Sequence, residues 1–213
     1  MSSVDGGGDV RGGDGCGGDG RAAGADVLAF LMGRASVHAQ LLEAPAPDSS
    51  QVQALLDVAM RAPDHGGLTP WRYVVVEGEG RRALGALLRA AQAARAPGST
   101  EAELDAAASK PLRAPMVIVA VAHVHDHPKV PASEQLLAAG ASVTLLLLAA
   151  EAMGFGASWL SGPNAYGEAV HAGLGLGSNE QVIGLVHIGT PRRERGGDKA
   201  RASSVGVTRR WPA

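Results

Sequence analysis

The sequence predicts an α+β fold in which a few strands alternate with long helices. Three runs, at residues 73–76, 116–122 and 182–188, are rich in β-branched and other apolar residues, as expected for strands in a core. The segment from Ser133 to Met153 is apolar on nearly every side, which is typical of a helix at the centre of a domain or between two subunits. A chain of 213 residues has little else with which to cover such a helix, so we favour a helix shared by two subunits.

The first 25 residues are predicted to be disordered, and residues 26–213 to form one domain. Residues 1–25 contain ten of the 30 glycines, interleaved with aspartates, and bury too little apolar surface to offset the entropy lost on ordering. The first helix is expected to begin at Asp26, a residue type that caps helices, and to end before Gly33. The single cysteine, Cys16, predicts no disulfide framework.

Helical periodicity then predicts two helices around the first strand. The helix before the strand is expected to be capped by Ser49 or Ser50, and it carries apolar residues at helical spacing from Val52 to Ala59. The helix after the strand follows a turn at residues 77–80. Its predicted core face consists of Leu84, Leu87, Leu88 and Ala91.

Two more helices are predicted in the second half of the chain. Thr100 and Glu103 have the spacing of a capping box, which starts a fourth helix that residues 113–115 are expected to end. After the long apolar helix and a short extended segment, Asn164 is expected to cap a brief helix near residues 168–174.

Charge and hydropathy argue against two classes of partner. The formal net charge of −2 gives no electrostatic reason for nucleic-acid binding. The longest apolar run, residues 136–150, is shorter than the about 20 residues that span a bilayer. The N-terminus has no apolar stretch typical of a secretory signal. We therefore expect a cytoplasmic protein with no nucleic-acid or membrane partner.

The segment from Met60 to His65, followed by Trp71, has the most unusual composition. Pro63 ends the preceding helix, because its ring prevents the hydrogen-bond ladder from continuing. Arg61 and His65 offer donors to an anionic ligand, and Trp71 anchors the next strand. The alternative is a cation favoured by the helix dipole together with an ordinary loop histidine. The residues alone leave both interpretations open.

Two further segments carry groups that bind ligands. Arg34-Ala35-Ser36 offers a guanidinium fork and a hydroxyl to phosphate oxygens, although these residues alone are explained more simply as a solvated arginine and a linker. The segment 154–163 is rich in glycine, which permits close approach of a ligand to the backbone beside Trp159 and Ser161. Its alternative is a helix end followed by a strand and a turn.

His123, His125 and His127 alternate at the end of the second predicted strand. An extended strand would place all three on one side, as a transition-metal site requires. No further cluster with ligand spacing accompanies them, so a solvated strand end is the simpler interpretation. A metal-dependent hydrolase built on these histidines remains one alternative function.

Taken together and in this order, these segments resemble the nitroreductase family of FMN-dependent oxidoreductases, and most closely its short-chain NAD(P)H nitroreductase branch. The resemblance runs from about residue 26 to residue 191, and residues 60–65 with Pro70-Trp71 are its most specific part. Residues 113–115, 129–135 and 154–159 support it. The sequence contains no GxSxG elbow, no P-loop, and no GxGxxG after a strand.

The resemblance implies an α+β, nitroreductase-like fold of three layers, with a central mixed or antiparallel sheet flanked by helices, and an interlocked homodimer. It also implies that FMN lies at the dimer interface and touches both subunits. By resemblance, the FMN contacts are Arg34, Ala35, Ser36, Arg61, His65, Trp159, Leu160 and Ser161. The stretch that corresponds to NAD(P) binding consists of Ala149, Ala150, Glu151, Ala152, Met153 and Gly154.

The family further implies that NAD(P)H reduces the flavin, which then reduces a nitroaromatic, a quinone or a similar small molecule. This chain departs from its branch at two positions, because Ala35 and Leu160 stand where the branch commonly has cations. Two missing charges weaken phosphate binding. An FMN-binding or flavin-scavenging protein without reductase turnover is therefore the main alternative.

Overall fold

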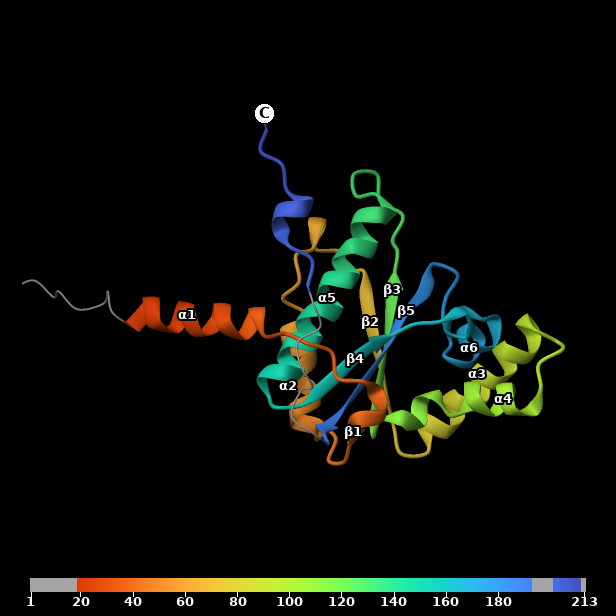
Figure 1. The fold of residues 1–213 in the computed structure, drawn as a ribbon. Coiled ribbons are helices and arrows are strands. Elements are labelled where there is room, and N and C mark those ends of the chain that lie inside the picture. The colour runs from red at the N-terminus through yellow and green to blue at the C-terminus, as the bar shows by residue number, and fades with distance from the viewer. Residues whose placement is uncertain (1–18, 193–200, 212–213) are drawn as a thin grey trace, which may run out of the picture. The chain divides into compact units, whose positions relative to one another are not determined.

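The computed structural model describes residues 19–192 and 201–211 (Figure 1). The chain falls into two units that divide between Arg34 and Ala35. The first unit contains helix α1, Asp19–Met32, which Gly33 follows as predicted. The predicted start at Asp26 was wrong, because arginine and alanine residues that favour helix precede it. Residues 1–18 lie outside the described residues, so the disordered tail and the single domain stay predictions.

The second unit contains a five-stranded sheet whose pairings are all antiparallel. The strand order is β1-β5-β3-β2, and β4 also pairs with β5. The three predicted strands are confirmed, and the last is longer than expected because its end pairs with β1. The bounds are Leu42–Glu43 (β1), Trp71–Glu77 (β2), Met116–His123 (β3), Gly156–Leu160 (β4) and Glu180–Pro191 (β5).

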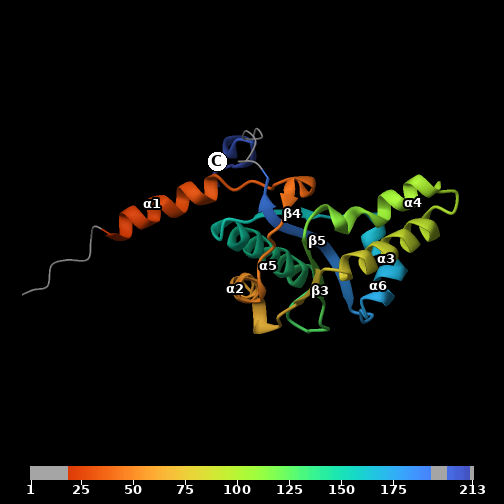
Figure 2. The same cartoon turned by 90° about the horizontal axis from the view of Figure 1, so that it is seen from below.

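Helices cover both faces of the sheet, which gives three layers (Figure 1, Figure 2). Successive residues of β3 point to opposite faces: Ile118 packs beneath α2 and α5, whereas Val119 packs beneath α3 and α6. This two-sided burial explains why the whole of β3 before His123 is apolar. The helices are Ser49–Ala59 (α2), Gly80–Arg95 (α3), Glu101–Ala108 (α4), Ala132–Ala152 (α5) and Glu168–Gly173 (α6).

The cap of α2 differs from the prediction. Asp48, rather than Ser49 or Ser50, accepts a hydrogen bond from the backbone N–H of Gln51 at 2.9 Å. The side chain of Gln51 accepts one from the N–H of Asp48, also at 2.9 Å. This reciprocal pair satisfies two backbone donors at once, which a lone serine cap does not do.

Asn164 does not cap α6, which begins after Gly167 without a side-chain cap. Instead Asn164 is buried, donates to Gln92 at 2.9 Å and accepts from Arg95 at 3.1 Å. Both partners belong to α3. The predicted cap was therefore wrong, and the residue ties the segment after β4 to the helical layer beside it.

The capping box at the start of α4 is confirmed, because Thr100 Oγ1 accepts from Glu103 N and the Glu103 carboxylate accepts from Thr100 N. The helix ends at Ala108, earlier than expected. We expect Thr100→Ala to lower the free energy of unfolding by about 1 kcal/mol, because the cap is lost. Urea unfolding measures this loss, and Thr100→Ser, which keeps the hydroxyl, should recover most of it. Equal stabilities for the two variants would contradict the prediction.

Helix α5 is apolar on nearly every side, as predicted, and one side of it is buried in the unit. By length and composition alone it could cross a membrane, a property that it shares with the core helices of globular proteins. Ser142 at its middle donates to the Ala59 carbonyl at 2.9 Å and lies 2.6 Å from the Tyr73 hydroxyl. Burial raises the pKa of Tyr73 to about 12. These contacts fix α5 against α2 and the sheet, whereas Leu137 remains 75% exposed.

Candidate functional site

A cavity of about 280 Å³ lies at the end of β4. We call it the cationic cavity, because Lys110 and Arg113 line it. Two of the predicted flavin contacts, Leu160 and Ser161, line it as well. The other lining residues are Leu88, Gly162, Asn164, Ala165, Leu185 and His187.

Lys110 and Arg113 belong to a short 3-10 helix, Lys110–Arg113, that joins α4 to β3. Pro111 is buried within this turn. Directly after it, the Ala114 carbonyl accepts a hydrogen bond from Arg81 of α3 at 2.7 Å. The burial of Pro111 and the hydrogen bond from Arg81 together fix this turn. They keep the two cations next to the end of β4.

Ser36, another predicted flavin contact, does not line the cationic cavity, but it precedes a residue that is bonded to β4. The N–H of the next residue, Val37, donates to the Ala157 carbonyl in β4 at 3.0 Å. The side chain of Val37 packs in a small buried cluster with Leu42 and Ala114. The structure therefore brings together residues 36–37, β4 and the turn that carries the cations, although they are far apart in the sequence.

His187 is buried at the wall of the cationic cavity, with 1% of its surface exposed. Its Nε2 lies 3.0 Å from the Lys110 carbonyl oxygen and its Nδ1 3.3 Å from that of Leu185. Burial lowers the pKa of His187, and the nearby charge of Arg113 lowers it as well. The positive charge of the cavity therefore comes from Lys110 and Arg113, while a neutral His187 holds the backbone of their turn.

Three donor side chains of the cationic cavity have no partner among the residues that the structure describes. Within residues 19–192 and 201–211, the side chains of Lys110, Arg113 and Ser161 have no hydrogen-bond or ion-pair partner. Both cations are partly buried. Such a set of donors suits an anion with a planar ring or a phosphate group. Sequence reasoning missed both cations, since it interpreted residues 113–115 only as the end of a helix.

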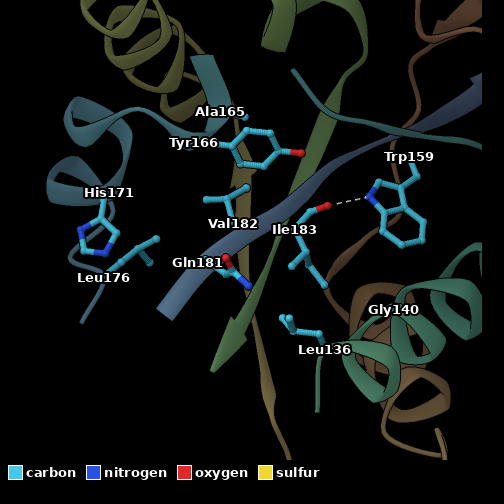
Figure 3. Close-up of a pocket in the computed structure, with 10 residues that line it drawn as sticks. All are labelled: Leu136, Gly140, Trp159, Ala165, Tyr166, His171, Leu176, Gln181, Val182 and Ile183. Carbon is cyan, nitrogen blue, oxygen red and sulfur yellow. Dashed lines mark hydrogen bonds between the residues drawn. The ribbon is translucent and has the colours of Figure 1, made fainter. Parts of the chain in front are cut away.

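A larger cavity, of about 610 Å³, lies along the edge of β5 beyond the end of β4 (Figure 3). We call it the apolar cavity. β4 pairs with residues 185–189 of β5 and with no earlier residue of that strand. Among the described residues, the preceding stretch 181–183 therefore has a neighbouring strand, β3, on one edge and none on the other. The lining residues are Leu136, Gly140, Trp159, Ala165, Tyr166, His171, Leu176, Gln181, Val182 and Ile183. Its size and apolar walls suit a flat organic ring.

Trp159 lines the apolar cavity and precedes two residues that line the cationic cavity. Its indole N–H donates to the Ile183 carbonyl at 3.0 Å, so the side chain lies across the exposed edge of β5 (Figure 3). The indole forms one wall of the apolar cavity, whereas the next two residues, Leu160 and Ser161, line the cationic cavity. Alternation along β4 separates Trp159 from Leu160, because successive side chains of a strand point to opposite faces, whereas Ser161 follows the end of the strand.

Arg61 and His65 lie elsewhere, after the end of α2. The Nδ1 atom of His65 is 2.8 Å from a carboxylate oxygen of Glu134, at the start of α5. These two side chains, 61% and 49% exposed, line a third cavity of about 330 Å³. Neither Arg61 nor His65 lines the cationic or the apolar cavity, so one chain alone does not bring them to the other predicted flavin contacts.

Arg34 and Ala35 fall on either side of the division between the two units. The N–H of Arg34 donates to the Leu31 carbonyl at 3.3 Å, which places it directly after the last turn of α1. Ala35 is partly buried and carries no group that could bind a phosphate. The assignment of Arg34 and Ala35 to the flavin site stays a prediction.

The predicted NAD(P) stretch forms the C-terminal end of α5 and the turn that follows. Ala149 and Ala150 are buried, and Glu151 is partly buried. The remaining residues, 152–154, are exposed. Only this last part is accessible to a ligand in a single chain.

The three histidines considered as metal ligands do not form a site. β3 ends at His123, so the expected strand alternation does not extend to His125 and His127. The rings of His123 and His125 pack with centroids 4.3 Å apart, and His127 accepts from the N–H of Val130 at 3.1 Å. In the part of the chain that the structure describes, no three His, Cys, Asp or Glu side chains could hold a metal ion together. The hydrolase alternative therefore has no structural support.

The sequence pattern of the nitroreductase family matches residues 31–190. The chain is 40% identical over 167 residues to YdjA of Escherichia coli K12, provisionally named an NAD(P)H nitroreductase, with 78% of this chain and 89% of that protein covered. A nitroreductase-like family protein from Bacillus cereus superposes with a TM-score of 0.75 at 25% identity, over 88% of this chain and 96% of that chain. An FMN-dependent nitroreductase from Clostridium difficile R20291 shares the fold, with a TM-score of 0.58 at 19% identity over 84% and 93% of the two chains.

The matched residues include every residue that lines the cationic and the apolar cavity. The solved structures confirm the nitroreductase-like α+β fold that the resemblance implied. The chain therefore belongs to the nitroreductase family and is an oxidoreductase.

Proposed function

We propose that the protein is an FMN-dependent oxidoreductase that takes electrons from NAD(P)H and passes them to a nitroaromatic, a quinone or a similar small molecule. The cationic cavity is the observation that carries this proposal. Lys110, Arg113 and Ser161 face it without partners among the described residues, and the end of β4 forms its wall. These donors fit a flavin nucleotide, whose phosphate and reduced ring are both anionic.

Bound FMN would supply the hydride chemistry, and the protein supplies orientation and charge. Arg113 offers a planar fork that can hold two acceptor oxygens, whereas Lys110 acts as a point charge. Because both side chains are partly buried, their attraction for an anion is stronger than that of fully exposed cations. They supply positive charge beside Leu160, one of the two positions at which the branch commonly carries a cation, and this favours a working flavin site.

We further propose a homodimer. Helix α5 packs on the unit by one side, while Leu137 on its outer side remains 75% exposed. Val58 and Met60, near the end of the adjacent α2, are 41% and 42% exposed. A second copy would cover this apolar surface. It would also bring the partner subunit's His65 to the flavin, a contact that one chain alone does not provide.

The NAD(P)H contact is proposed at the accessible end of the predicted stretch, residues 152–154. The cytoplasm is the proposed location, because the sequence has no disulfide framework and the electron donor is a cytoplasmic metabolite.

An absorbance spectrum tests the flavin proposal directly. Protein purified after addition of FMN should show flavin absorbance that stays with the chain on gel filtration, at a mass of two copies. Anaerobic addition of NADH or NADPH should then bleach it. Protein that stays colourless would overturn the proposal, and bound flavin that neither nucleotide bleaches would favour a flavin-binding protein without turnover.

A further inference from the structure

Gly184 lies directly beneath the Trp159 indole. A Cβ atom built on Gly184 would lie 1.9 Å from Nε1 and 2.3 Å from Cδ1 of Trp159. The three atoms nearest to this Cβ all belong to Trp159. Distances this short cannot be tolerated, so any side chain at position 184 must displace the indole.

The backbone around Gly184 imposes no such requirement. Gly184 pairs with Ala120 directly before an irregularity in the sheet at Ile183, and its φ does not fall in the left-handed region that favours glycine. Alanine would therefore be compatible with the strand itself. The indole, which occupies the space of a side chain at position 184, accounts for the glycine.

We propose that Gly184 is a positioning residue of the candidate site: its missing side chain lets the Trp159 indole approach β5 closely and donate to the Ile183 carbonyl, and in this position the indole holds a flat aromatic ring in the apolar cavity. This inference rests on the proposed function. Leu136, Leu176 and Ile183 supply the apolar walls, and the indole supplies an aromatic surface on which a ring can stack. The ring belongs either to the flavin or to the electron acceptor.

Gly184→Ala tests the proposal, with Gly189→Ala as a matched control. Gly189 lies on the same strand and is also crowded, since its Cβ would lie 2.7 Å from Pro115 and 2.9 Å from the Glu43 carbonyl oxygen, both closer than ordinary van der Waals contact. No Trp159 atom is among its nearest neighbours. Both substitutions strain β5, but only Gly184→Ala should move the indole.

The first readout needs no flavin. Each of the three tryptophans gives one indole N–H signal in a nitrogen-15 NMR spectrum, and Trp159→Ala identifies the signal of Trp159. In Gly184→Ala this signal should shift and exchange faster with water, because the bond to the Ile183 carbonyl is lost. It should stay in place in Gly189→Ala. An unchanged signal in Gly184→Ala overturns the proposal, whether or not the protein binds FMN.

The second readout uses the FMN-loaded full chain. Gly184→Ala should raise either the Kd for FMN or the KM for a quinone acceptor about 10-fold or more, because a displaced indole no longer supports the ring. A change in Kd assigns the ring to the flavin, and a change in KM alone assigns it to the acceptor. If neither constant changes beyond its value in Gly189→Ala, the proposal is wrong.

A double-variant cycle separates positioning from simple strain. In a Trp159→Ala background, Gly184→Ala should cause no further loss of stability or binding. Gly189→Ala should reduce the stability of that background by as much as it reduces the stability of the parent. If Gly184→Ala alone does not fold, Gly184→Ala with Trp159→Ala should restore folding. Failure of that double variant to fold overturns the proposal.

Discussion

Neutralising both cations of the cationic cavity should remove nearly all FMN binding. Lys110→Met and Arg113→Met each keep the aliphatic stem and remove the charge. A hydrogen bond to a charged group is worth about 1.5–3 kcal/mol, so each change should weaken FMN binding about 10-fold to 100-fold. The double variant should therefore bind at least about 100-fold more weakly, if the two contributions add.

Flavin fluorescence titration of the full chain measures this loss. The control is Arg82→Met with Arg89→Met, which removes the same net charge from α3. Arg82 pairs with Glu79, and Arg89 pairs with Glu101 and Asp105, all of which lie away from the cavity. The control should bind FMN as the parent does. Equal affinities for the two double variants would show that overall charge, and not the cavity, holds the flavin.

The second large effect is expected at the ion pair between Arg72 in β2 and Glu180 at the start of β5. The Arg72 guanidinium donates to both carboxylate oxygens of Glu180, one bond measuring 2.9 Å, and the N–H of Gly177 donates to the same carboxylate at 2.8 Å. The Glu180 side chain is only 10% exposed. This pair joins two strands that lie on opposite sides of β3, and it holds the loop before β5.

The hydrogen bonds from Arg72, and then the one from Gly177, hold the pKa of Glu180 at about 2, below its ordinary value of 4.5. Because the folded-state pKa is the lower one, the carboxylate stabilises the fold above pH 4.5, and this contribution is lost as the pH falls toward 2. Glu180→Gln should therefore lower the free energy of unfolding by about 2 kcal/mol at neutral pH. The difference in the free energy of unfolding between Glu180→Gln and the parent should become smaller as the pH falls from 4.5 to 2.

Urea unfolding at a series of pH values measures both parts of this expectation. Glu79→Gln is the control, because Glu79 pairs with Arg82 while 86% exposed, and such surface pairs contribute at most about 1 kcal/mol. If Glu180→Gln and the parent have the same free energy of unfolding at every pH, the ion pair does not contribute to stability.

Much of the fold was predictable because its elements are strongly periodic. The buried strand β3, the core face of α3 and the capping box of α4 each have a pattern that only one local structure satisfies. One error occurred where a residue had two possible sets of partners. Asn164 is a typical cap residue, but a buried amide gains more from two bonds to α3 than from capping a helix of six residues.

The sequence by itself determined the helical and strand periodicity and the family resemblance, because these depend on neighbouring residues in a continuous segment. The resemblance also led to the prediction that Leu160 and Ser161 contact the flavin. Only the tertiary structure decided that Lys110 and Arg113 face the same cavity as Ser161. It also decided that Gly184 makes room for Trp159. Antiparallel pairing and helix packing bring such residues together across long separations, and a local pattern carries no signal of that contact.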